Sequence, residues 1–352
     1  MGVSGGGTTY QGPLDIVSGA TALYSLRAGS AAIAAAGTQK LVNIRRASDN
    51  VACDFLVASS GGFGVTTATC NSSTQGGVSY GTFVGSDGTA SCTLAGTTGA
   101  CTGASGTVHV NDVVTGTGLT QPCIVSSASN TAPTIEIAGT TTSCGTISVA
   151  ETFTFQVAGF ATDMYDQSGN TNDVTQVTAG KQPQFLPNCG TALPCLVFNG
   201  GQVLAGSIGS TSQPFTLSDV MSRVSGFTLY QIVTEGSNTS ESEFSNAANT
   251  RSLYSGSRFT ATASDSTFHS VQSIIAGASP SSILVVDNTA TTGSSGGSNL
   301  GTSITIGEQS GGGFPLTAYM YSDAIWAIAM NSTQYGGICH NERLYYGTPG
   351  SC

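Results

Sequence analysis

The sequence predicts an all-β fold, a sandwich of short strands into which a small β module is inserted. Apolar residues make up 39% of the 352 residues, whereas charged residues make up only 8%. Much of the apolar content is Val, Ile, Phe and Tyr in short runs between Gly-rich turns, which is typical of strands on a half-buried pleated surface. The clearest runs are Thr152–Val157, Leu196–Phe198, Phe227–Val233, Ser282–Val286 and Ala324–Met330.

Composition divides the chain into three parts. We expect residues 1–12 to form an arm that is flexible or ordered only on assembly. We expect residues 13–60 and 150–352 to form the sandwich. Over residues 61–149 charge nearly vanishes, and Thr, Ser and Gly dominate, so this stretch predicts the inserted module. No helix longer than two turns is expected, and a short terminal helix is predicted over His340–Tyr346, because Asn341 can cap it.

The charge balance excludes two classes of partner. The net charge is −10, so tight nucleic-acid binding through phosphate neutralisation is not expected. An anionic membrane surface would repel the chain, and no apolar run approaches the ~20 residues of a membrane span. Met1–Tyr10 has no basic region and no apolar region, so no secretory signal is visible there.

The ten cysteines predict disulfides rather than a zinc site. No Cys-x-x-Cys occurs, and the three histidines are far apart in the sequence. The alternatives are buried free thiols and pairing between subunits. We expect three local pairs and two further ones: Cys189–Cys195, Cys92–Cys101 and Cys339–Cys352, then Cys53–Cys70 and Cys123–Cys144.

Several segments carry a resemblance to a known family. They are, in chain order, Gly12–Ile16, Ala22–Arg27, Ile44–Asn50, Met164–Asn172, Val174–Gln176, Lys181–Gln184, Leu196–Gly201 and Glu342–Gly347. This order resembles the catalytic domain of arabinofuranosidase B-type glycosidases and the phage tail and particle proteins that share its fold. The resemblance implies a concanavalin/LamG-like jelly-roll β-sandwich over roughly residues 12–60 and 155–350. That fold serves enzymes, lectins and inert particle proteins, so it does not define a function.

A glycosidase needs two carboxyl groups flanking the scissile bond. Glu241 and Glu243 are the candidates, because residues i and i+2 of a strand share one face, and the alternative is an exposed polar loop. The family's nucleophile lies in an acidic segment followed by paired asparagines, and this chain has Arg258–Ser264 at the expected place. No catalytic residue is therefore carried over from the family, and we expect no hydrolysis.

Glycan binding is predicted at two places. Asp166, Gln167 and Asn170 form a turn signature that either joins two strands or contacts a sugar. Tyr319 and Tyr321 share one face of a strand and could stack on a sugar ring, whereas Trp326 lies in an apolar run and is expected in the core. No cofactor is expected; the one metal considered is calcium, with the carboxylates of Asp163, Asp166 and Asp173.

These observations predict a phage virion structural protein of the tail, fibre or capsid-decoration type, with a jelly-roll surface domain that binds host or environmental glycans. Its expected partners are other virion proteins, further copies of itself and polysaccharide. The expected location is the virion or the extracellular space. The alternatives are an arabinofuranosidase-like hydrolase and a dedicated receptor-recognition protein that binds carbohydrate.

Overall fold

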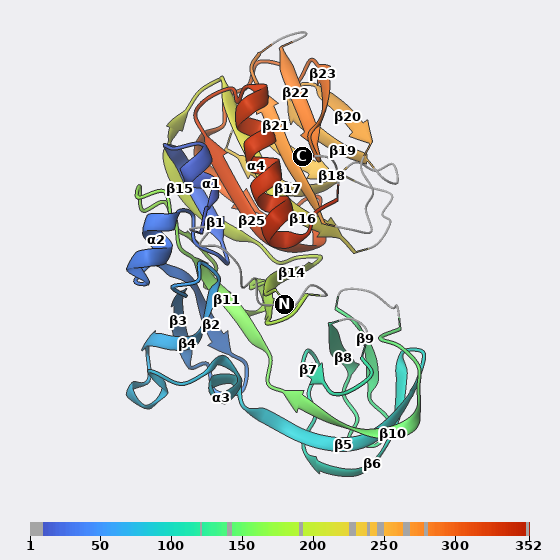
Figure 1. Ribbon diagram of the computed structural model, residues 1–352. Coiled ribbons are helices and arrows are strands. Elements are labelled where there is room, and N and C mark those ends of the chain that lie inside the picture. The colour runs from blue at the N-terminus through green and yellow to red at the C-terminus, as the bar shows by residue number, and fades with distance from the viewer. Residues whose placement is uncertain are drawn as a thin grey trace.

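The computed structural model confirms an all-β architecture (Figure 1). It describes residues 10–119, 122–138, 143–189, 193–224, 230–237, 240–244, 250–262, 268–277, 281–349 and 352. The expected arm, residues 1–12, therefore lies mostly outside the described residues. No helix in the described part of the chain is long and apolar enough to span a membrane.

Two antiparallel layers form the sandwich. In the first layer the long strand β25 is flanked on one edge by β16 and on the other by β1 and β14. Its strands are β23 (Thr289–Gly293), β22 (Ser282–Val286), β21 (His269–Ile275), β16 (Phe215–Arg223), β25 (Thr317–Trp326), β1 (Ala20–Ser25) and β14 (Cys195–Asn199).

The second layer faces the first. Its strands are β20 (Arg258–Thr262), β19 (Thr250–Ser255), β18 (Ser240–Phe244), β17 (Gln231–Gly236), β24 (Gly301–Ile306), β15 (Leu204–Thr211), β12 (Val174–Thr175), β11 (Gly159–Met164), β2 (Lys40–Arg46), β3 (Ala52–Val57) and β4 (Phe63–Cys70). Strand β13 (Gln184–Leu186) joins the layers by pairing with β11 and β14. Apolar side chains from both layers, such as Leu217 and Leu253, meet in one core.

The predicted strands agree in part with these bounds. Ser282–Val286 coincides with β22, and Leu196–Phe198 lies within β14. The strand predicted to reach Met330 ends at Trp326, which is 1% exposed and belongs to the core as expected. The start of the Phe227–Val233 run lies outside the described residues, and β17 begins at Gln231.

The inserted module is a small closed barrel with its own apolar core (Figure 1). Its strands are β5 (Ser86–Ala95), β6 (Thr98–Gly106), β7 (Val113–Thr115), β8 (Cys123–Ser127), β9 (Thr134–Ile137) and β10 (Ile147–Gln156). The barrel thus begins later and ends later than the expected 61–149. Strand β4 pairs with β3 and belongs to the sandwich, because Cys70 lies opposite Cys53 and bonds to it.

The helices are short except for the last. They are α1 (Pro13–Ile16), α2 (Ala31–Ala36), α3 (Tyr80–Val84) and α4 (Ser332–Tyr346), with 3-10 turns at Ser73–Gln75 and Ala179–Lys181. The prediction for α4 was wrong in length, since Asn331 and Gln334 cap it reciprocally and the helix begins at Ser332, eight residues before His340. Gly337 made the sequence look unlike a helix at this point. A Cβ atom at this position would lie only 2.7 Å from Ile16 of α1, so the contact between the two helices needs a glycine there.

All five predicted disulfides are confirmed. Every cysteine pairs within the chain, so no sulfur remains for a bond between subunits. Disulfides in this number are typical of proteins that fold in an oxidising, extracytoplasmic compartment. The chain is therefore of the extracellular type.

Candidate functional site

The loop predicted to contact sugars follows β11 and lies against β1. The Asp166 carboxylate accepts backbone N–H bonds from Leu23 at 2.9 Å, Ser168 at 2.8 Å and Asn172 at 3.1 Å. Asp166 is only 6% exposed. Its oxygens are therefore occupied in closing the loop, as expected of a structural turn.

The other two predicted loop residues also bind the chain itself. Gln167 accepts the N–H of Gly29 at 2.8 Å and donates to the carbonyls of Ser25 and Arg27, each at 2.9 Å. The exposed Asn170 donates its amide to backbone carbonyls of β1. These side chains attach the loop to β1, and Asp166 and Gln167 are buried there, whereas Asn170 is exposed. The geometry therefore favours the structural reading of this turn.

A hollow of about 370 Å³ lies beside this loop, between it and α2. That volume falls within the roughly 300–1,000 Å³ of small-molecule sites. Its lining comes from α2, the start of β2 and the loop: Ile33, Ala36, Thr38, Gln39, Lys40, Tyr165, Asp166, Gly169, Thr171 and Asp173.

Tyr165 is the half-buried aromatic wall of the hollow. Its hydroxyl donates to Asp54 Oδ1 at 2.6 Å, and Lys40 Nζ lies 2.6 Å from Asp54 Oδ2 and 5.2 Å from the tyrosine ring centre. Burial, together with the bond to Asp54, raises the pKa of Tyr165, so the ring stays neutral. An aromatic ring beside an ammonium and the Asp173 carboxylate offers an apolar surface and hydrogen-bonding groups at one place.

Of the two predicted sugar-stacking tyrosines, Tyr321 is buried and Tyr319 is partly exposed. Tyr321 is 0% exposed, and its ring stacks between Phe268 and Tyr346, with centroids 4.0 and 4.7 Å away. Tyr319 is largely buried and donates its hydroxyl to the carbonyl of Ala138 in the barrel module. The prediction for Tyr321 was wrong, because β25 is an internal strand and this ring is covered by Tyr346 of α4 and by Phe268.

Glu241 and Glu243 share a face of β18, as predicted, but they do not form an exposed loop. Glu241 lies opposite Glu235 on β17 and Tyr254 on β19, and Tyr254 lies opposite Arg258 on β20. The Arg258 guanidinium pairs bidentately with Glu243, and its Nη2 is 3.9 Å from Glu241 Oε2.

The two predicted carboxyl groups of this cluster have different electrostatic surroundings, which act on their pKa values. Burial, and then the charge of Glu243, raise the pKa of Glu241 to about 8. Arg258 opposes the upward shift that burial imposes on the pKa of Glu243. Arg258 Nη2 lies 3.0 Å from Glu243 Oε2 and 3.9 Å from Glu241 Oε2, so one guanidinium group contacts both carboxyl groups.

The cluster is closed rather than open. Glu241 is 3% exposed and Glu243 is 0% exposed. The side chains that reach the surface are Arg258 and, beneath its guanidinium, the rings of Tyr230 and Tyr254, at 3.7 and 5.0 Å. A substrate bond could not lie between these two carboxyl groups without displacing Arg258.

The core also holds charged residues that the sequence analysis missed. Asp219 and Asp323 lie opposite each other on β16 and β25, and Arg251 Nη2 donates to Asp219 at 2.6 Å. All three side chains are at most 1% exposed. Burial raises the pKa of both aspartates. Asp219 lies between the apolar residues Leu217 and Met221 on one face of β16, and this place within an apolar face is the signal that could have indicated it.

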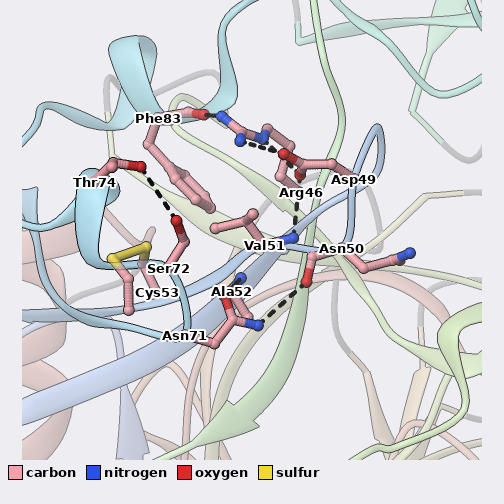
Figure 2. Close-up of polar contacts among 11 residues, drawn as sticks. Arg46, Asp49, Asn50, Val51, Ala52, Cys53, Asn71, Ser72, Thr74 and Phe83 are labelled. Carbon is pink, nitrogen blue, oxygen red and sulfur yellow. Dashed lines mark hydrogen bonds and ion pairs between the residues drawn. A yellow bond between two sulfur atoms is a disulfide. The ribbon is translucent and has the colours of Figure 1, made fainter.

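Arg46, in the resemblance segment Ile44–Asn50, has a structural role. Figure 2 shows its guanidinium between the Asp49 carboxylate and the carbonyl of Phe83, and Nε donates to Asp49 at 2.9 Å. The same view shows Asn71 beside Asn50 and Ala52, near the Cys53 disulfide. These contacts hold the β2–β3 turn.

The three aspartates considered for calcium do not gather as one ligand set in the described part of the chain. Asp173 Oδ1 accepts a hydrogen bond from the backbone N–H of Asp166 at 2.8 Å. The Asp166 carboxylate accepts hydrogen bonds from the backbone N–H groups of Leu23 and Asn172. Asp163 accepts a hydroxyl hydrogen bond from Thr162.

Comparisons with known proteins agree on the fold. No family model matches the chain, and no curated protein matches it. One similar solved structure is an arabinofuranosidase in complex with arabinofuranosyl-α-1,2-xylobiose, with a TM-score of 0.54 and 12% identity. Another is a GH54 α-L-arabinofuranosidase soaked with a cyclic sulfate inhibitor, with a TM-score of 0.52 and 13% identity.

Both alignments cover 94% of this chain but only 64% of the solved chain. The protein thus spans less than two thirds of the length of these enzymes. The arabinofuranosidase-like fold implied by the resemblance is confirmed, and the similarity extends to the fold alone.

Proposed function

We propose that this chain is a glycan-binding structural protein on the exterior of a phage particle and that it does not hydrolyse the glycan. The order of its motifs, which resembles that of phage particle proteins, supports the first part. The disulfides support an extracellular location. The observation that carries the proposal is the hollow beside Tyr165, open and lined by aromatic and charged groups, while Glu241 and Glu243 are buried.

The hollow suggests how a sugar binds. One face of a sugar ring would lie against Tyr165 or the apolar side chains of Ile33 and Ala36, and its hydroxyls would meet Lys40 and Asp173. Tyr165 is held in place by Asp54, so little side-chain entropy is lost on binding.

Glycan binding is tested with the full chain on an array of bacterial surface polysaccharides and arabinose-containing oligosaccharides. Loss of one aromatic contact of about 0.5–1.5 kcal/mol predicts an affinity roughly 2- to 12-fold weaker for Tyr165→Ala. The matched control is Tyr254→Ala in the glutamate cluster, which should bind like the wild type. Silence across the array, or weakening by the Tyr254 substitution alone, would refute the proposal.

The particle location is tested separately. Mass spectrometry of purified particles should find the chain in a fixed ratio to the major particle proteins, together with its structural partners. If the chain occurs only in the soluble fraction of infected lysates, the virion role is wrong.

Hydrolysis is the second candidate function. It is favoured by the contrast between Glu241, whose pKa is about 8, and its neighbour Glu243, which is paired with Arg258. We expect no release of 4-nitrophenol from 4-nitrophenyl α-L-arabinofuranoside, a compound with which one of the similar enzymes was soaked. Release that disappears in Glu241→Gln and persists in Glu235→Gln would establish hydrolysis instead.

A further inference from the structure

The barrel module is almost free of charge, and its few charged side chains meet. Between residues 61 and 149 the only Asp, Glu, His, Lys or Arg residues are Asp87, His109, Asp112 and Glu136. The first three converge, and one ligand atom from each lies within 4.8 Å of the others. Three of four such residues in so long a stretch are thus gathered at one point.

Two separate segments build this cluster. Asp87 lies near the start of β5, whereas His109 and Asp112 lie in the turn between β6 and β7. His109 Nδ1 is 2.5 Å from Asp87 Oδ2, and Asp112 Oδ2 accepts the backbone N–H of His109 at 2.7 Å. The turn thereby orients both of its side chains toward Asp87.

The local charge is not balanced by a permanent cation. No Lys or Arg occurs in the sequence between Arg46 and Lys181, so His109 is the module's only basic group. The site is also accessible, because the His109 side chain is 60% exposed.

We propose that Asp87, His109 and Asp112 bind a divalent transition-metal ion, with Zn²⁺ as the best fit. One imidazole nitrogen and two carboxylate oxygens are ligands that zinc accepts, and three protein ligands leave a fourth position for water. Calcium and magnesium prefer sites made only of oxygen, so they fit this set less well. This site lies in the module and is separate from the proposed glycan site.

A bound ion would link the start of β5 to the β6–β7 turn. Zinc holds its ligand atoms at about 2.0–2.2 Å, so His109 Nδ1 and Asp87 Oδ2, now 2.5 Å apart, would separate to admit the ion. Because the ion binds the folded module and not the unfolded chain, it raises the thermal midpoint as its concentration exceeds the dissociation constant.

The test uses the full, tag-free chain with its disulfides intact, after treatment with a chelator. Zinc chloride is titrated by calorimetry, and bound zinc per chain is measured after dialysis. The variants are Asp87→Asn and His109→Gln, and the matched control is Glu136→Gln, an acid of the module that lies outside the cluster. Circular dichroism checks that each variant is folded. If Asp87→Asn does not fold, His109→Gln decides the test, because His109 is exposed and its replacement should leave the fold intact.

We expect one zinc ion per chain in the wild type and in Glu136→Gln. Affinity should fall by about tenfold or more in the two ligand variants, since even outer-shell changes cost about 10- to 100-fold. The thermal midpoint should rise with zinc only where the ion binds. Absence of zinc uptake by the wild type, or equal uptake by all four proteins, would overturn the proposal.

Discussion

Removing Arg251 should destabilise the sandwich strongly. Its guanidinium donates to Asp219 at 2.6 Å and to Ser242 at 3.1 Å, and it lies 4.3 Å from the centre of the Phe244 ring. Replacing it with Met leaves Asp219 facing Asp323 in a core where both aspartates are at most 1% exposed. Breaking one side of a buried ion pair costs about 3–5 kcal/mol.

Protonation of the two aspartates should keep the free-energy cost near the lower end of this range. Burial raises the pKa of both aspartates, so they can take up protons instead of remaining as charges. A loss of about 3 kcal/mol corresponds to a fall of roughly 4–6 °C in the thermal midpoint of a domain of this size.

The assay is thermal unfolding at pH 7, followed by near-ultraviolet circular dichroism. Arg343→Met is the matched control, because Arg343 is exposed on α4 and its loss should change stability by about 0.5 kcal/mol or less. The double variant Arg251→Met with Asp219→Asn should recover part of the loss, since it removes one unpaired acid. Equal midpoints for Arg251→Met and Arg343→Met would refute this reasoning.

Three further predictions concern other parts of the fold. Burial raises the pKa of Glu342 to about 8, so from about pH 4.3 to 8 the free energy of unfolding should fall with rising pH, by up to about 1.4 kcal/mol per pH unit. Glu342→Gln should make this decline shallower when unfolding is measured as a function of pH, and an unchanged slope would contradict the assignment. Asn331→Ala should cost about 1 kcal/mol by removing the N-cap of α4, against no loss for the exposed Leu344→Ala. Opening Cys339–Cys352 with a double Ser substitution should cost about 3 kcal/mol, and peptide mapping that links either cysteine elsewhere would show the pairing to be wrong.

The strands and disulfides were predictable from local patterns. Ser282–Val286 is β22 because a short β-branched run between turns has few other stable states, and Cys92–Cys101 pairs across a tight hairpin. The length of α4 was not predictable, because Gly336 and Gly337 lower helix propensity, and only the packing against α1 explains Gly337.

The candidate site was harder to predict, because it depends on contacts between distant segments. Asp166 and Gln167 were correctly singled out as a turn, but their polar groups turn inward to β1, which residue spacing does not reveal. Tyr165 becomes the wall of the hollow only because α2 and the start of β2 face it. Likewise, Glu241 and Glu243 share a strand face as expected, yet they are buried on an internal strand and pair with Arg258 of β20.

The most direct test of the central claim is a crystal structure of the chain soaked with the oligosaccharide that the array selects. The account predicts an intact oligosaccharide in the hollow between α2 and the Asp166–Asn172 loop, with a sugar against Tyr165 and hydroxyls near Lys40 and Asp173. Glu241 and Glu243 should remain covered by Arg258. A sugar seated between those two glutamates, or a cleaved one, would contradict the account.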